Sequence, residues 1–408
     1  MWSMSVRARP AEPATALPPL RRGGHTPRIL LVGAYERDNL GDLLFLLVTE
    51  RYVAEAEVVA AAPFAADMRA LLDRRVHAYG PLLRDEPWDV VWTVGGQVGS
   101  IDLRRAYRLS ASPEDLARFD RANPLTRARI LRRAVGGVRV EAPYIPDLTP
   151  GALTIVNSAG VSGIRWLPAG RRERLTRLLR TRSSITVRDG ASSRFLTNAG
   201  IEHHLAPDAV HAVNRLWPGE RDPRSDVAVV QVSRGILAEI GLDRLAAALA
   251  ASPALAKLRI RLLLAGTANG HDAAEDLERL AAAVRRAAPG RDIALLEARR
   301  PRELVEEIRR AKVVVASSLH VRIVAAAFGI GRVSLSRPKT TRYARTWDAD
   351  MPFDVGPDGL DAAVARAIAR AEEPEAAAHA AGLSRLAHER LNALAHRALE
   401  RVPASYAG

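Results

Sequence analysis

The sequence predicts an α/β fold with parallel sheets in two domains. Short apolar runs typical of buried strands alternate along the chain with longer amphipathic segments typical of helices. The loops between them are short, which favours parallel strands joined by right-handed crossovers. At 408 residues the chain is too long for one ordinary hydrophobic core, so two domains are expected.

The first domain is expected over residues 27–215, after a disordered lead-in over residues 1–26 that is rich in Pro, Ala and Arg. Its predicted strands are 28–35, 56–62, 88–94, 152–158, 184–188 and 201–206. The alternation breaks over residues 101–150, where Ser112 begins a helix and an arginine-rich stretch without acids follows. This basic insertion is either a lid over an anionic substrate or a solvated helix pair, and the solvated pair is the favoured interpretation.

A linker is expected at residues 216–226, where turn-forming residues cluster, followed by a second domain over 227–356 and a helical tail over 357–408. The predicted strands of the second domain are 227–232, 258–265, 292–297, 312–317 and 332–335. Its predicted helices are 236–250, 272–287, 302–310 and 320–328.

The composition excludes several classes of protein. The chain has no cysteine, which removes disulfides, thiolate-bound zinc and cysteine nucleophiles, and no histidine–carboxylate cluster has metal-site spacing, so no metal or other cofactor is expected. No apolar run reaches the roughly 18–20 residues of a membrane span. The net charge of +14 comes from arginines spread through the helices, so no nucleic-acid partner is expected. A cytoplasmic protein is predicted, with association at the inner membrane face left open because a basic surface suits anionic lipids. The oligomeric state is not determined.

The most informative turn surrounds His320. A buried strand at 312–315 runs into Ser317, Ser318 and His320, and an apolar helix follows. Ligands of open α/β sheets bind at such strand-to-helix turns, and the free N–H groups there favour an anion. Because imidazole titrates near neutral pH, His320 is the candidate acid or base. The alternative is a histidine that only packs.

Two further strand ends carry candidate binding loops. Asn39 and Asp42 begin a helix and are either caps or contacts to sugar hydroxyls, since Asp42 would repel a phosphate. Gly95, Gly96 and Gln97 follow a buried strand, and glycines there let backbone approach a ligand closely.

Three cationic residues are candidate anion contacts. Lys339 is expected in a loop after a strand, where it suits a phosphate as a point charge. Arg188 ends a strand beside Asp189, so it either grips an anionic ligand or locks a helix start. Arg322 lies about half a turn from His320, so it reaches the ligand only if the first helical turn is open.

The order of these pieces resembles the polysaccharide pyruvyl transferase family. The resemblance runs from about residue 27 to 350 and is carried by Asn39-Leu40-Gly41-Asp42, Gly95-Gly96, Val187-Arg188-Asp189, Pro207-Asp208-Ala209, Ser318-Leu319-His320 and Pro338-Lys339. It implies a GT-B-like fold, in which two Rossmann-like domains with parallel sheets face a cleft. It also implies transfer of an enolpyruvyl-derived group from phosphoenolpyruvate to a sugar, leaving a pyruvate ketal.

The resemblance also implies roles for the candidates. His320 would be the acid or base, Lys339 and one or more arginines would hold phosphoenolpyruvate as co-substrate, and the loops at Asn39–Asp42 and Gly95–Gln97 would hold the acceptor. The expected acceptor is a nucleotide-linked or lipid-linked glycan precursor.

Two alternatives remain. A GT-B glycosyltransferase would use a sugar-nucleotide donor, but the stretch after His320 offers no acid for a ribose before Asp348. A catalytically inactive relative would bind a glycan without turning it over. Ser318 motivates this alternative, because many members of the family carry arginine at that place.

Overall fold

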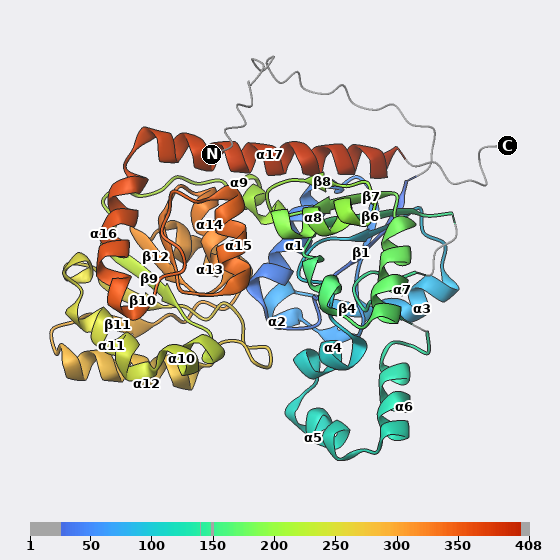
Figure 1. The fold of residues 1–408 in the computed structure, drawn as a ribbon, viewed down its shortest axis with the longest axis horizontal. Helices are drawn as coiled ribbons and strands as arrows, with labels where there is room; N and C mark the ends of the chain where they lie inside the picture. Colours follow the sequence, from blue (N-terminus) through green and yellow to red (C-terminus); the bar gives the residue numbers. More distant parts are fainter. Residues whose placement is uncertain (1–25, 139, 148–150, 401–408) are drawn as a thin grey trace.

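Two parallel sheets covered by helices form the body of the protein, and one long helix at the C-terminal end runs along the top of both in Figure 1. The computed structural model describes residues 26–138, 140–147 and 151–400, so the expected lead-in lies almost entirely outside the described residues.

The first sheet has eight strands in the order β3-β4-β2-β1-β5-β6-β7-β8. They are β1 (Arg28–Val32), β2 (Glu57–Ala62), β3 (Ala66–Asp67), β4 (Arg75–Ala78), β5 (Val90–Thr93), β6 (Leu153–Ala159), β7 (Ser184–Val187) and β8 (His204–Leu205). Its helices are α1 (Leu40–Tyr52), α2 (Arg69–Leu72), α3 (Tyr79–Asp85), α7 (Ala169–Arg180), α8 (Gly190–Asn198) and α9 (Val213–Leu216), with 3₁₀ turns η1 (Ser162–Trp166) and η2 (Ala209–Ala212). All neighbouring strands are parallel apart from β3 and β4. The edge strand β3 and its neighbour β4 were not predicted, because they are short, have few buried residues and so lack an apolar run.

The second sheet has five parallel strands in the order β11-β10-β9-β12-β13. They are β9 (Val227–Gln231), β10 (Arg259–Leu262), β11 (Ile293–Leu295), β12 (Val313–Ala316) and β13 (Gly331–Ser334). Its helices are α10 (Arg234–Ile240), α11 (Leu242–Ala251), α12 (Ala274–Ala287), α13 (Pro301–Arg309), α14 (Leu319–Ala327) and α15 (Pro338–Trp347), with 3₁₀ turns η3 (Pro253–Leu255) and η4 (Pro357–Gly359).

Two local predictions in this half were wrong. The helix expected over 236–250 is divided at Gly241, whose φ of +91° ends α10 before α11 begins. Lys339 was expected in a loop but lies in the first turn of α15, because Pro338 occupies the first helical position, where a missing N–H costs nothing.

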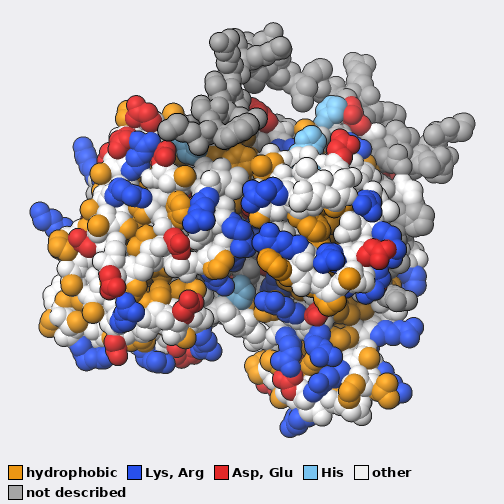
Figure 2. Space-filling view, viewed as in Figure 1, with side chains coloured by type: hydrophobic (Ala, Val, Ile, Leu, Met, Phe, Trp, Pro, Cys, Tyr) orange, Lys and Arg blue, Asp and Glu red, His pale blue; other side chains and the backbone are white. Residues whose placement is uncertain are grey.

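The basic insertion forms three short helices, α4 (Leu103–Ser110), α5 (Pro113–Arg121) and α6 (Pro124–Ala134), of which α5 and α6 project from the body in Figure 1. Asp102, Ser112 and Asn123 cap them through their side chains. The projecting lobe carries many arginines and few acids on the face in Figure 2. Helices α5 and α6 fit the solvated interpretation, whereas α4 lies against the body.

The C-terminal helices are α16 (Leu360–Ala371) and α17 (Pro374–Leu399). Helix α17 runs back from the second sheet to the first (Figure 1), where Arg390 Nε donates to Thr186 Oγ1 of β7 at 2.8 Å. One apolar cluster includes residues from both halves, among them Phe45, Val324 and Leu391. The two sheets are therefore held together by a shared core, and α1 meets α14 between them.

Candidate functional site

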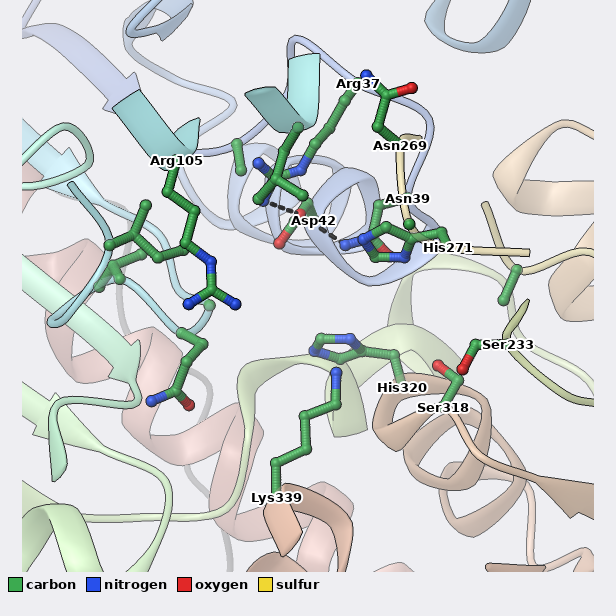
Figure 3. Close-up of a pocket in the computed structure, with 18 of the residues that line it drawn as sticks. Arg37, Asn39, Asp42, Arg105, Ser233, Asn269, His271, Ser318, His320 and Lys339 are labelled. Carbon is green, nitrogen blue, oxygen red and sulfur yellow. Dashed lines mark hydrogen bonds and ion pairs between the residues drawn. The ribbon is translucent and has the colours of Figure 1, made fainter. Parts of the chain in front are cut away.

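A cavity of about 420 Å³ lies between the two sheets, at the carboxyl ends of their strands. Most of the predicted site residues line it: Asn39, Asp42, Gly96, Gln97, Arg188, Ser318, His320 and Lys339. In Figure 3 the side chains of Asp42, His320 and Lys339 point toward the same open space. The loops that follow β1, β5 and β7 in the first sheet therefore meet the loop that follows β12 in the second sheet.

Three predicted site residues do not line the cavity. Gly95 packs against α1 instead, since an added Cβ would lie 2.5 Å from the ring of Phe45. Ser317 is fully buried, and its hydroxyl accepts from the backbone N–H of Ser233 at 3.0 Å.

Arg322 is the third of these, and it lies on the far side of α14. The first turn of the helix is closed by a bond from the Arg322 N–H to the Ser318 carbonyl at 3.3 Å, so the condition for ligand contact is not met. The buried guanidinium instead donates to Asp348 Oδ2 at 2.8 Å and to Ser334 Oγ at 3.0 Å. Arg322 is therefore a structural residue.

His320 lies at the contact between the two halves. An added Cβ on Gly41 of α1 would lie 1.7 Å from His320 Nδ1, so only glycine at position 41 leaves room for the imidazole. Phe45 of α1 packs edge-on against the ring, with centroids 5.2 Å apart. Gly41, in the first half of the protein, therefore provides the space that the His320 ring occupies.

The hydrogen bond between His320 and Arg188 determines the tautomer of the ring. Arg188 Nη1 lies 3.2 Å from His320 Nε2 and 2.6 Å from Asp208 Oδ2. A guanidinium can only donate, so Nε2 accepts and the neutral ring carries its proton on Nδ1. Burial, followed by the charges of Arg188 and Lys339, holds the pKa of His320 well below its usual 6.5. Without a ligand the imidazole is neutral.

Lys339 and Arg337 supply positive charge without a balancing carboxylate. Among residues 26–138, 140–147 and 151–400, neither forms an ion pair, and the Arg337 guanidinium has one contact, to Ser233 Oγ at 3.3 Å. Burial, with the neighbouring charges of Arg337 and Arg188, lowers the pKa of Lys339 from 10.5 to about 7. Both residues begin α15, whose N-terminus adds partial positive charge.

On the opposite wall, Asp42 is held by two donors. Arg37 Nη2 donates to Asp42 Oδ2 at 3.0 Å, and Asn39 Nδ2 donates to the same oxygen at 2.6 Å (Figure 3). Neither Asn39 nor Asp42 caps α1 through its side chain, so the capping alternative is not supported. The second oxygen, Oδ1, has no hydrogen bond within the described ranges and remains available to a ligand.

Sequence reasoning missed a polar group in the cavity wall, at the N-terminus of α14. Gln231 ends β9, and its Oε1 accepts from the Ser318 N–H at 2.8 Å. Its Nε2 donates to Asp272 Oδ1 at 2.8 Å, and burial raises the pKa of Asp272 to about 7. Gln231 is a polar residue at the end of an apolar strand, and His320 also follows such a strand. This position in the sequence could have identified Gln231 as a site residue. Asp272 was expected at the start of a helix over 272–287, but α12 begins at Ala274 and Asp272 lies in the loop before it.

The loop containing Asp272 also joins the two halves. The Leu40 N–H donates to the Ala265 carbonyl at 2.7 Å, and Thr267 Oγ1 donates to Asp38 Oδ2 at 2.7 Å. An added Cβ on Gly266 would lie 2.5 Å from the Asp38 carbonyl oxygen, so glycine is required for this close approach. The cavity therefore has walls fixed by both halves.

Within the described ranges, no group of three or more His, Asp or Glu side chains is arranged to hold a metal ion. In the same residues, no helix is both long and apolar enough to cross a membrane.

Comparisons with known proteins agree with the resemblance seen in the sequence. The family model described as polysaccharide pyruvyl transferase matches residues 139–338, which include Arg188, Asp208 and His320. No curated protein matches the chain.

Solved structures show the fold. A putative UDP-N-acetylglucosamine 2-epimerase from Listeria monocytogenes is 11% identical, with a TM-score of 0.50 over 93% of this chain and 99% of that one. Anabaena HepE, solved in complex with UDP-glucose, is 13% identical, with a TM-score of 0.49 over 92% of this chain and 100% of that one. The predicted GT-B-like arrangement of two Rossmann-like domains is confirmed.

Proposed function

Because residues 139–338 belong to the polysaccharide pyruvyl transferase family, we propose that this protein moves an enolpyruvyl-derived group from phosphoenolpyruvate onto a sugar and leaves a pyruvate ketal. One observation carries the proposal. Lys339 and Arg337 place positive charge without ion-pair partners in the cavity that also contains His320. Phosphoenolpyruvate offers a carboxylate and a phosphate to such a site, and each gains charge-assisted hydrogen bonds there.

The donor is proposed to lie against the second half of the protein. Lys339 and Arg337 would bind its phosphate, and the first turn of α14 would add backbone N–H groups. The Ser318 side chain makes no capping bond to this turn. A serine at position 318 leaves space that a longer side chain would fill, and Arg337 supplies a cation from the neighbouring helix.

In the proposed reaction a proton is first added to the donor's methylene carbon, which leaves a positive charge on C2. One sugar hydroxyl then adds to C2 and loses its proton, the C–O bond to phosphate breaks, and a second hydroxyl closes the ring as it loses its own. One of these two protons replaces the proton given to the methylene carbon, and the other leaves with phosphate. The products are the ketal and inorganic phosphate.

His320 is proposed to carry the first proton. In the ligand-free protein its Nε2 is occupied by Arg188, and the ring is neutral. An anionic donor would draw the guanidinium of Arg188 toward itself, and its negative charge would raise the pKa of His320. Donor binding would therefore free Nε2 and favour its protonation, so that the acid forms only when the donor is present.

The acceptor is proposed to lie against the first half. Asp42 Oδ1 would accept a hydrogen bond from a sugar hydroxyl and take its proton as the hydroxyl attacks. Asn39 and Arg37 hold the other oxygen and so orient the carboxylate. Gly96 and Gln97 complete this wall of the cavity.

A sugar-nucleotide donor is the alternative, because the GT-B-like fold by itself does not distinguish the two donors. The first acid after His320 that the sequence offered for a ribose, Asp348, is buried and accepts hydrogen bonds from Arg322 and Arg332. Asp348 is therefore not available to a nucleotide.

The test is incubation with phosphoenolpyruvate and a panel of glycosyl acceptors, with phosphate release as the readout. We expect release that requires an acceptor and is lost in His320→Gln. Consumption of a sugar nucleotide without any acceptor-dependent phosphate release would instead establish the alternative.

A further inference from the structure

Arg105 of the basic insertion is a cation of the cavity wall that the proposed chemistry leaves unused. Figure 3 shows its guanidinium pointing into the cavity from the side of α4, apart from Lys339 on α15. Within the described ranges its side chain forms no ion pair or hydrogen bond, and only its backbone N–H is bound, to Asp102 Oδ1 at 2.7 Å.

Helix α4 is held firmly in the position that aims Arg105 at the cavity. Ser110 Oγ, at the end of the helix, donates to Glu36 Oε1 at 2.9 Å. Asn269 of the second half donates from Nδ2 to the carbonyl oxygens of Arg108 and Ala111 at 2.9 and 3.0 Å. Residues from both halves thus fix α4 to the rim, so Arg105 belongs to the site rather than to the projecting lobe.

The other arginines on this side of the cavity are already balanced. Arg37 pairs with Asp42. Arg188 pairs with Asp208 in the ligand-free protein and is proposed to turn toward the donor when it binds. The donor's charges have their own partners in Arg337 and Lys339. Arg105 is therefore the cation left for a second anionic group, and a neutral sugar would gain no charge-assisted bond from it.

We infer that the acceptor is an anionic glycan that presents a phosphate or a carboxylate to Arg105. This inference rests on the proposed function and deepens it, because it assigns Arg105 as the residue that selects among acceptors by their charge. A sugar linked through phosphate and a sugar with a uronic acid share this chemistry.

The experiment measures equilibrium binding in the absence of phosphoenolpyruvate. Each candidate sugar is offered as its methyl glycoside, its 1-phosphate and its uronic acid methyl glycoside, to the native protein, Arg105→Ala, Lys339→Ala and a control, Arg104→Ala. Arg104 is an exposed neighbour on α4 that does not line the cavity. Since the Lys339 charge also attracts anions, its variant shows which part of the binding belongs to the donor side.

We expect at least one anionic form to bind more tightly than its neutral partner, with a 10- to 100-fold loss in Arg105→Ala, as for a lost charge-assisted bond. Arg104→Ala should match the native protein, and the form that responds tells a phosphate from a carboxylate. Equal binding of neutral and anionic forms, or a preference that survives in Arg105→Ala, would overturn the inference. So would binding that depends on Lys339 alone. Arg105-dependent binding without phosphate release from phosphoenolpyruvate would reject the proposed function but keep the anion site.

Discussion

Helix α14 separates two groups of cations that differ in how their charges are balanced. Behind it, Arg322 and Arg332 share Asp348, and the Arg322 guanidinium also donates to the carbonyl oxygens of Pro352 and Met351. In front of it, Lys339 and Arg337 form no ion pair with a carboxylate among the described residues. The cations behind α14 have their anionic partner within the protein, whereas the cations in front of it would gain one only when an anionic ligand binds. In this comparison, the ion-paired cations behind α14 stabilise the fold, and the cations in front of it, which have no ion pair, line the cavity.

The largest expected effect breaks the group behind α14. Arg322→Leu should lower the free energy of unfolding by about 3–5 kcal/mol, because it leaves buried carbonyl oxygens and part of the Asp348 charge without a donor. Chemical denaturation measures this, with Arg302→Leu on the exposed side of α13 as the control. A loss below about 1 kcal/mol, the usual range of exposed ion pairs, would show that the network contributes little.

His320 offers the next test, on the front of the same helix. His320→Gln should keep the fold and most donor binding, because Gln preserves the size and one hydrogen bond. Turnover should fall by about 10²–10⁴, the usual contribution of general acid–base catalysis. Thermal unfolding and steady-state phosphate release, measured together, separate the two quantities. Unchanged turnover would mean that the imidazole only packs between α1 and α14.

Lys339→Ala should have the opposite effect to Arg322→Leu, because it should weaken donor binding without lowering stability. The KM for phosphoenolpyruvate should rise about 10- to 100-fold through loss of a charge-assisted bond, and turnover should fall as well if the charge stabilises departing phosphate. The free energy of unfolding should stay the same or increase, since an unbalanced charge has been removed from a crowded cationic site. Lys257→Ala, at an exposed lysine, is the matched control. A strongly destabilised Lys339 variant with native KM would place Lys339 with the structural cations.

The smallest expected effect is on pH dependence. Burial and neighbouring cations lower the pKa of Lys339 to about 7, so the ligand-free side chain is charged below that pH and neutral above it. A phosphate ester is fully ionised above its pKa of about 6, so from pH 7.5 to 9 donor binding must return a proton to the lysine. Donor affinity should then fall by up to about tenfold per pH unit. Lys339→Arg, which stays charged, should reduce the slope to the part that protonation of His320 contributes, and parallel profiles for the two proteins would refute the assignment.

The sequence alone determined the alternation of strands and helices and the loops that follow them. Buried strands such as β1, β5, β9 and β12 are continuous apolar runs, and polar residues follow the runs that end at the cavity, because parallel strands bind ligands at their carboxyl ends. The His320 turn and the Asn39–Asp42 loop were therefore predictable. The short strands β3 and β4 were not, since they lack the apolar pattern that predicts a strand.

Only the tertiary structure decided which of these residues act together. Gly41 and His320 are far apart in the chain, yet a methyl group on one would collide with the ring of the other. Arg322 and Lys339 are both cations near His320 in sequence, and only the carboxylate at Asp348 separates the structural one from the candidate ligand contact. Whether a cation has an ion-pair partner depends on contacts between residues far apart in the chain, and local sequence patterns do not predict those contacts.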